Sequence, residues 1–385
     1  METSDQNCGC SKTNTLVSIT GMEGKHKSCQ APAEEIPSSA MINRNFIIGT
    51  IQTPAGAIPQ IATHLDASDY LGAVRVRWGI KRDRYRVDPG LYAVGAPNEY
   101  SDVLVTANYK LSFDTVRNNL NGLNVWLLVL DTKGVNVWCA AGKGTFGTKE
   151  LVQRIQTTSL SMIVKHKRII LPQLGATGIA AHLVKESSGF TVIYGPVRAS
   201  DIPSFIQTGY KATKEIRRVN FGWYDRIKLI PNDIIFNLRY LLSLLVIISV
   251  ISGINTSGYS IQQALRNIFP IAKIIMAGYF AGLILTPIFL PYIPTQNFSF
   301  KGVILGAVVS ALLFLNQSLD GNLLTQFAEI FFIVGFSSFL AMNFTGASTF
   351  TSLAGVKKEM RIAVPMQIAS GVIAMILVVL HTLFS

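Results

Sequence analysis

The run NVWLLVLD at residues 124–131 is apolar at six consecutive positions between Asn124 and Asp131. A strand that is apolar on both faces is typical of a parallel sheet that helices cover on both sides. Shorter strand-like runs lie on either side of it, at 91–95, 102–107, 168–171 and 190–194. Helical patterns separate them, at 112–120 with Ser112 as the N-cap, at 148–157 and after Ser200. This alternation predicts a Rossmann-like α/β domain at 41–210, whose ligands would bind at the carboxyl ends of the strands. The region before residue 90 allows few elements to be placed.

The second part of the chain differs from the first in hydropathy and charge. The mean hydropathy of the 385 residues is +0.37, and only seven of the 34 Lys and Arg and three of the 22 Asp and Glu follow residue 234. Five apolar segments lie there, at 234–254, 270–293, 302–315, 323–344 and 362–384. Most approach the roughly 20 residues that a helix needs to cross a bilayer core. The third is short, and an extension past Asn316 would lengthen it. The sequence therefore predicts an all-α transmembrane domain of about five helices at 234–385.

Two segments flank the α/β domain. Residues 1–40 are rich in Ser, Thr, Asn, Gly and Pro, which predicts a flexible tail. The linker at 211–233 carries a basic cluster: Lys211, Lys214, Arg217, Arg218, Arg226 and Lys228. A net charge of +12 is compatible with nucleic-acid binding, but the place of this cluster favours a juxtamembrane anchor to anionic lipid, with no nucleic-acid partner.

The same cluster predicts the orientation in the membrane. Basic residues favour the inner side, so the α/β domain is expected in the cytoplasm and Ser385 outside after five crossings. Arg266 and Lys273 would then lie on the outer side, which opposes this orientation without outweighing it. The sparse cysteines and the absence of an apolar signal-peptide core also favour a reducing cytoplasm.

The segment NVWCAAGK at 136–143 is the strongest candidate for chemistry. It follows the buried strand through a strand-like stretch at 135–138 and leads into a glycine-rich turn before the helix at 148–157. Cys139 is thereby expected where α/β domains bind ligands. A lone cysteine in a sheet is usually a small buried residue. Here, however, small neighbours let another molecule approach the backbone, and Lys143 and a nearby helix N-terminus favour a thiolate.

Other chemistries fit this segment less well. A nucleophilic cysteine needs a positioned histidine base, and neither His166 nor His182 lies in a recognisable Cys/His signature. Zinc needs further ligands at suitable spacing, and none lies near Cys139. The Walker phosphate-loop spacing is absent because Gly144 interrupts it, so nucleotide hydrolysis is not favoured.

The octet matches, position for position, the signature N-(V/I)-W-C-A-(A/G)-G-K of the HgcA family of mercury-methylating corrinoid proteins. The stretches at 105–114, 126–134, 171–182 and 193–203 resemble the same family, as do the membrane segments, so that the resemblance spans roughly residues 45–385. The soluble domain is similar to the corrinoid-binding domain in the large subunit of the corrinoid iron–sulfur protein. The four-cysteine cluster motif of that protein is missing here. The resemblance therefore implies that electrons come from a partner, a ferredoxin of the HgcB type with two 4Fe–4S clusters.

The resemblance also implies roles for single residues. Cys139 corresponds to the lower axial ligand of the corrinoid cobalt, and Thr106 matches a position that faces the cofactor. The segment that approaches the corrin face contains Asn136, Val137, Trp138 and Ala140. By location we add as candidates for holding the nucleotide tail Gly142, Lys143, Gly175, Gly178, Ala180 and Gly195. These last six fit turn glycines and ordinary strand ends equally well.

The implied enzyme is a membrane-anchored corrinoid-dependent methyltransferase that forms methylmercury. An anionic thiolate opposite the methyl group would push electron density onto cobalt, so that methyl leaves with its electrons toward the soft electrophile mercury(II). In the implied cycle, methyltetrahydrofolate or a methyltransferase that uses such a donor charges cob(I)alamin, and the ferredoxin later reduces cobalt again.

Two other functions remain open. A corrinoid methyl carrier of one-carbon metabolism would share the cobalt ligation and differ in its acceptor. A transporter or sensor is less favoured because the apolar segments hold few ionisable residues, chiefly Arg239, Lys273 and Glu329. Cys8 and Cys10 form a C-x-C pair that fits delivery of mercury(II), although flexible tails commonly carry such residues without a function.

Overall fold

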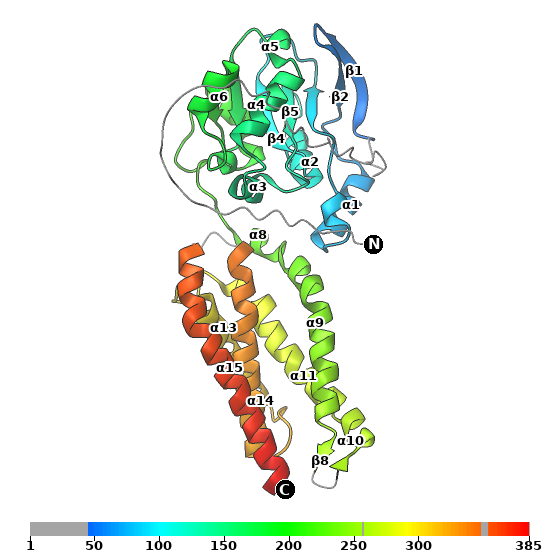
Figure 1. Ribbon diagram of the computed structural model, residues 1–385, viewed down its shortest axis with the longest axis vertical. Helices are drawn as coiled ribbons and strands as arrows, with labels where there is room; N and C mark the ends of the chain where they lie inside the picture. The colour runs from blue at the N-terminus through cyan, green and yellow to red at the C-terminus, as the bar shows by residue number, and fades with distance from the viewer. Residues whose placement is uncertain (1–44, 256–257, 348–352, 385) are drawn as a thin grey trace, which may run out of the picture. The chain divides into compact units, whose positions relative to one another are not determined.

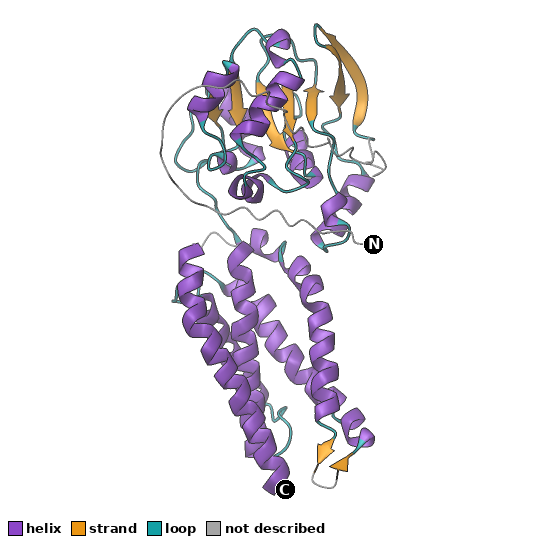
Figure 2. Cartoon of the chain, in the orientation of Figure 1, coloured by secondary structure: helices purple, strands orange, loops and turns teal. Residues whose placement is uncertain are grey.

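The computed structural model describes residues 45–255, 258–347 and 353–384. The predicted tail at 1–40 lies outside the described residues. Strands and helices alternate up to residue 207, and from residue 223 the described chain is helical except for one short hairpin (Figures 1 and 2). The strands of the first part are β1 (Ile47–Thr53), β2 (Gly56–Ile61), β3 (Gly90–Val94), β4 (Val103–Ala107), β5 (Val125–Leu130), β6 (Arg168–Leu171) and β7 (Thr191–Tyr194). Its helices are α1 (Ala67–Arg77), α2 (Lys110–Asn118), α3 (Val137–Lys143), α4 (Thr148–Thr157), α5 (Leu160–Ile163), α6 (Ala181–Ser188) and α7 (Ile202–Gln207). The short 3-10 turns are η1 (Arg82–Arg84), η2 (Gln173–Gly175) and η3 (Ala199–Asp201).

The seven strands form one mixed sheet in the order β1-β2-β3-β5-β4-β6-β7. Strands β5, β4, β6 and β7 are parallel, as the apolar runs predict. The prediction is wrong for β3, which runs antiparallel to β5. The reason is the short connection at 95–102 between β3 and β4, because a crossover between parallel strands needs a dozen or more residues.

The order of the four parallel strands reverses between β4 and β6. The chain passes from β4 to β5 on one side, and then returns to place β6 on the other side of β4. In parallel sheets covered by helices, such a reversal opens a crevice outside the carboxyl ends of the two strands.

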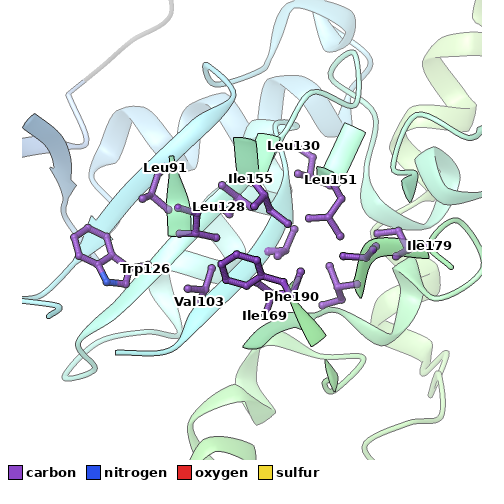
Figure 3. Packing of buried hydrophobic residues seen from close by; sticks show 14 of the residues in the cluster. Leu91, Val103, Trp126, Leu128, Leu130, Leu151, Ile155, Ile169, Ile179 and Phe190 are labelled. Atoms are coloured by element: carbon purple, nitrogen blue, oxygen red, sulfur yellow. The ribbon is translucent and has the colours of Figure 1, made fainter. Parts of the chain in front are cut away.

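Both faces of the sheet are buried against helices. Leu128 of β5 packs on one face in the same cluster as Leu151 and Ile155 of α4 (Figure 3). On the other face, Leu127 belongs to a second cluster with Phe113 of α2. Burial of each such side chain contributes about 1.5–3 kcal/mol, so the central strands fix the positions of the loops at their ends.

A buried network of four charges joins α1 to α2. Lys110 contacts Asp69 at 2.5 Å and Asp114 at 2.7 Å, while Arg117 contacts Asp69 at 2.5 Å and Asp114 at 2.9 Å. Burial raises the pKa of Asp69, but its hydrogen bond to Lys110 and the charges of Lys110 and Arg117 outweigh burial and hold this pKa below its usual value. Helix α2 begins at Lys110, so the predicted N-cap Ser112 lies inside the helix.

The region before residue 90, in which few elements could be placed, contributes the β1–β2 hairpin and α1. The turn at 53–56 reads Thr-Pro-Ala-Gly, and the Thr53 hydroxyl donates a hydrogen bond to the Gly56 carbonyl at 2.7 Å. Strand β2 pairs with β3 through only two residue pairs, which leaves Pro59 outside that ladder.

Among the described residues of the second part, five helices are long and apolar enough to cross a membrane, as predicted. They span Trp223–Ile251, Ile268–Phe289, Phe298–Leu315, Leu323–Asn343 and Gly355–Phe384. The first span consists of α8 (Trp223–Ile227) and α9 (Ile230–Ile251), and the second consists of α11 (Ile268–Tyr279), η4 (Phe280–Leu285) and α12 (Thr286–Phe289). Each of the other three is a single helix: α13 (Phe298–Leu315), α14 (Leu323–Asn343) and α15 (Leu353–Phe384). The shorter elements among them are β8 (Ile254–Asn255), β9 (Gly258–Tyr259), α10 (Ile261–Arg266) and η5 (Phe344–Ala347). The third helix gains its length before residue 302, and it ends at Leu315 instead of extending past Asn316.

The three ionisable residues that the sequence analysis named in the apolar segments have local partners. Lys273 donates to the Ser318 carbonyl at 2.6 Å and contacts Asp320 at 2.5 Å. Glu329 accepts the backbone N–H of Asp320 at 3.2 Å, and the Arg239 guanidinium stacks on the Tyr240 ring. These contacts give each of the three residues a partner close to it in the fold.

Candidate functional site

A pocket of about 400 Å³ opens where the strand order reverses. Its walls come from the ends of β4 and β6, from α2, from the start of α3 and from the loops after β6 and β7. Most lining side chains are apolar, including Leu104, Ile170 and Leu174. An apolar pocket with few polar groups is typical of a site for a small molecule or cofactor.

Thr106 supplies a polar atom to this pocket that lacks a protein partner. The residue belongs to β4 and is 1% exposed. Its hydroxyl has no hydrogen-bond partner among the residues that the structure describes. A buried hydroxyl without a partner costs about 1–3 kcal/mol, so a ligand that accepts or donates a hydrogen bond here would remove that cost.

Asn108, two residues further along, fixes the loop that leads to the octet. Its side-chain oxygen accepts from the Thr132 N–H at 3.1 Å, from the Thr132 hydroxyl at 2.9 Å and from the Gly134 N–H at 3.0 Å. Its amide nitrogen donates to Asp131 at 3.0 Å. Sequence reasoning missed this residue, although a polar residue directly after a buried strand was a usable signal.

The octet forms a short helix, α3, where the sequence predicted a strand-like stretch and a turn. The Asn136 side chain caps the helix by accepting the Cys139 N–H at 2.9 Å, and Gly144 ends it with a φ of +81°. These two caps outweigh the strand preference of Val137 and Trp138, because each satisfies backbone groups at a helix end. The structure therefore places Cys139 in the first turn of a helix and not at a strand end.

The first residues of α3 reach the pocket, and the cysteine follows them. Asn136, Val137 and Trp138 line the pocket, and the Trp138 side chain is 42% exposed. The Cys139 thiol is exposed and in no disulfide, but Cys139 is not itself among the lining residues. Ala140, also in α3, is fully buried. The sulfur is therefore accessible to a ligand at the edge of the pocket.

Two of the predicted cofactor glycines serve close packing under α3. A Cβ on Gly175 would lie 2.4 Å from the Phe146 ring, and one on Gly178 would lie 2.2 Å from the Phe146 carbonyl oxygen. Both positions therefore require glycine because Phe146 fills the space beside them. This packing accounts for the two residues without a ligand.

The other residues added by location are spread around the site. Gly142 and Lys143 are exposed at the end of α3, and a Cβ on Gly142 would meet no atom within 4 Å. The backbone N–H of Ala180 donates to the Thr148 hydroxyl at 2.8 Å. Gly195 follows β7 and packs against Ile170. Open space makes Gly142 and Lys143 more accessible to a bound molecule than Ala180 or Gly195.

Arg77 and Tyr109 are two of the lining residues of the pocket that were not predicted. Arg77 lies at the end of α1, and Tyr109 lies at the start of α2. Burial raises the pKa of Tyr109, so its phenol remains a neutral hydrogen-bond donor. Arg77 lies 59 positions before the octet in sequence and in a region without a clear pattern, so no sequence signal pointed to it.

Comparison with known families matches this part of the chain. The family model of the CO dehydrogenase/acetyl-CoA synthase delta subunit matches residues 11–206, just over half of the chain, and includes the whole of α3 and its pocket strands. The chain belongs to the CO dehydrogenase/acetyl-CoA synthase delta subunit family.

Several known proteins are similar to a part of this chain. The acetyl-CoA decarbonylase/synthase complex subunit gamma of Methanocaldococcus jannaschii is 34% identical over 137 residues, which cover 35% of this chain and 28% of the relative. The same subunit of Methanopyrus kandleri is 32% identical over 128 residues, or 33% of this chain and 27% of the relative. The corrinoid/iron-sulfur protein large subunit of Moorella thermoacetica is 34% identical over 122 residues, or 31% and 27%. The chain thus spans less than a third of the length of these relatives.

The hydrogen bonds of Asn108 are expected to stabilise the loop that leads to α3. Asn108→Ala removes four hydrogen bonds and leaves buried groups of the loop at 131–134 unpaired. We expect a loss of about 2–4 kcal/mol of local stability, measured as faster amide hydrogen exchange at 132–143. Asn119→Ala, which removes one exposed hydrogen bond to Thr115, is the control and should leave that exchange unchanged. Equal exchange in both variants would contradict the role of Asn108.

Proposed function

We propose that this protein is a membrane-anchored corrinoid-dependent methyltransferase that transfers a methyl group from cobalt to mercury(II), with Cys139 as the lower axial ligand. The observation that carries the proposal is the exposed Cys139 thiol on α3, whose preceding residues line the pocket at the reversal of strand order. The match of the octet to the HgcA signature supports mercury as acceptor. The order of the parallel strands supports a Rossmann-like corrinoid-binding domain.

The residues at the pocket fit a corrinoid. A corrin ring has broad apolar faces with amide side chains at its rim, and the pocket offers apolar walls together with the unpartnered Thr106 hydroxyl. Arg77 and Tyr109 add a cation and a neutral phenol donor for polar groups such as the phosphate of a nucleotide tail. The Moorella relative, by its name, is a corrinoid protein, which supports the same cofactor here.

The chain's own residues have separate tasks in this proposal. Asn136 holds the first turn of α3 in place, and the Cys139 sulfur would hold the cobalt of a bound corrinoid from an exposed position. A bound corrinoid would supply the chemistry of methyl transfer, in which the methyl group would pass with the electron pair of its bond to mercury(II) and give methylmercury. Trp138 adds an apolar, partly exposed ring to the wall of the pocket.

The same proposal includes the partners of the protein and its location in the membrane. A ferredoxin with two 4Fe–4S clusters supplies electrons, and methyltetrahydrofolate or a methyltransferase supplies the methyl group. The basic cluster beside the first membrane helix supports a cytoplasmic α/β domain. The boundaries at 41–210, 211–233 and 234–385 remain our proposed division of the described chain.

The conservative variant Thr106→Val separates stability from cofactor binding. Without corrinoid, we expect the variant to be as stable as the native protein or more stable, because it removes a buried hydroxyl without a partner. Corrinoid affinity should fall up to about tenfold through the lost hydrogen bond. Thermal unfolding and titration of the pocket with corrinoid measure the two effects. Thr132→Val, at a hydroxyl 2.6 Å from the Val135 carbonyl, should instead lose stability. Unchanged affinity in Thr106→Val would remove this residue from the site.

A methyl carrier of one-carbon metabolism is the second candidate. The names of the relatives, subunits of acetyl-CoA decarbonylase/synthase complexes, favour it. Such a carrier would pass the methyl group to an acceptor other than mercury.

A single-turnover experiment separates the two candidates. The full chain, purified without oxygen and carrying a methylated corrinoid, is mixed either with mercury(II) or with a nucleophilic thiolate. The proposal predicts methylmercury stoichiometric with corrinoid and little thiolate methylation. Transfer to the thiolate without methylmercury would assign the carrier function instead.

A further inference from the structure

A row of exposed apolar side chains lies on α1 and the turn after it. The exposed fractions are 59% for Tyr70, 51% for Leu71, 51% for Val74, 48% for Trp78 and 50% for Ile80. Residues 70, 74 and 78 are four apart, so they share one face of the helix, with Leu71 beside them. We call these five side chains the α1 row.

The α1 row is not part of the core. On the opposite face of α1, Asp69 and Val76 are 6% and 2% exposed, and Asp69 joins the buried charge network. The helix is therefore held to the domain by one face and presents the α1 row on the other. Large apolar side chains gathered on a surface commonly mark a binding site.

Basic side chains border the α1 row. Arg75 lies beside it on the helix, and Lys81, Arg82 and Arg84 follow, all four exposed. None of the four forms an ion pair with a carboxylate in the described part of the chain, although the Arg82 guanidinium donates a hydrogen bond to the Asn232 side-chain oxygen at 3.0 Å. Apolar and aromatic side chains flanked by Lys and Arg are the pattern that lies in the interface of an anionic bilayer.

We propose that the α1 row and these four basic residues dock the α/β domain onto the surface of an anionic lipid bilayer. The connection at 208–222 between α7 and α8 has 15 residues, which can extend to about 50 Å at most. The membrane helices therefore keep a bilayer within reach at high effective concentration, so weak apolar and ionic contacts suffice. The proposal concerns how the domain is held, and it is independent of the cofactor and the methyl acceptor.

Quenching of tryptophan by brominated lipid tests the docking on the full chain. The protein is reconstituted into phosphatidylcholine vesicles with phosphatidylglycerol, in which part of the acyl chains are brominated. Trp78→Phe and Trp138→Phe are a matched pair, because these side chains are 48% and 42% exposed but only Trp78 belongs to the α1 row. We expect the quenched fraction of the emission to fall in Trp78→Phe and not in Trp138→Phe. Vesicles without phosphatidylglycerol should reduce the difference between Trp78→Phe and the native protein.

A second variant keeps every tryptophan. Arg75→Gln with Arg84→Gln should lower quenching in anionic vesicles, whereas Lys149→Gln with Lys185→Gln, an equal loss of exposed charge on α4 and α6, should not. Equal quenching of Trp78→Phe and the native protein in anionic vesicles would overturn the proposal and assign the row to a soluble partner. Neither corrinoid nor mercury is present, so failure here leaves the proposed methyltransferase untouched.

Discussion

Methylmercury formation is expected to fall at least about 100-fold in Cys139→Ala, because even partners outside the first coordination shell of a metal change activity by about 10–100-fold. The α3 caps should survive, since the Asn136 side chain binds the backbone N–H of residue 139 and not its side chain. Corrinoid should remain bound through the pocket walls. The measurement is methylmercury formed by the full chain in membranes, normalised to bound corrinoid.

Two further variants separate the charge of the ligand from its mere presence. Cys139→His offers cobalt a neutral donor and should also fail to methylate mercury, because the thiolate charge is lost. Cys29→Ala removes a thiol outside the octet and should retain activity. Full activity of Cys139→His would show that an anionic donor is not required.

Arg117→Ala is expected to cause the largest loss of stability. Arg117 is fully buried, contacts Asp69 and Asp114, and donates to the carbonyls of Ala62 and His64 at 2.8 and 2.9 Å. Removal of one partner from a buried ion network costs about 3–5 kcal/mol, because the remaining charges stay desolvated. Amide hydrogen exchange in β5 of the full chain should therefore accelerate by more than about 100-fold.

The exposed pair Lys165–Glu99 provides the control for this network. Lys165→Ala removes a contact whose side chains are 59% and 44% exposed, so exchange in β5 should not change measurably. Within the network, Asp69 contributes a pH dependence of its own, whereas burial raises the pKa of Asp114 and gives that carboxyl the opposite sign. Since the folded pKa of Asp69 is lowered, its contribution is present above the unfolded value and is lost as the pH falls through the folded one. Equal effects of the two variants would contradict the account of the network.

The strands were predictable because their apolar runs are buried on both faces. Strand β5 and helix α4 follow the runs at 124–131 and 148–157 closely. The direction of β3 was predicted wrongly, since a run buried on both faces looks alike in parallel and antiparallel pairing, although the short connection at 95–102 was a signal in the sequence. Helix α3 was missed because Val137 and Trp138 favour strands, although Asn136 and Gly144 were the signals of its caps.

The residues of the candidate site were also predictable only in part. The octet was found from its place after a buried strand and Thr106 from a family resemblance, and the structure brings Thr106 together with Asn136, Val137 and Trp138 at one pocket. Arg77 could not be predicted, because its place at the pocket results from tertiary packing of α1. Gly178 looked like a residue that cradles a ligand, but the backbone of Phe146 occupies the space beside it.

The most direct test of the central claim is X-ray absorption at the cobalt edge of the purified full chain with bound corrinoid. We expect one sulfur atom in the first coordination shell of cobalt in the native protein, and we expect this atom to be lost in Cys139→Ala. A shell of nitrogen and oxygen alone in the native protein, unchanged by the substitution, would contradict the assignment of Cys139.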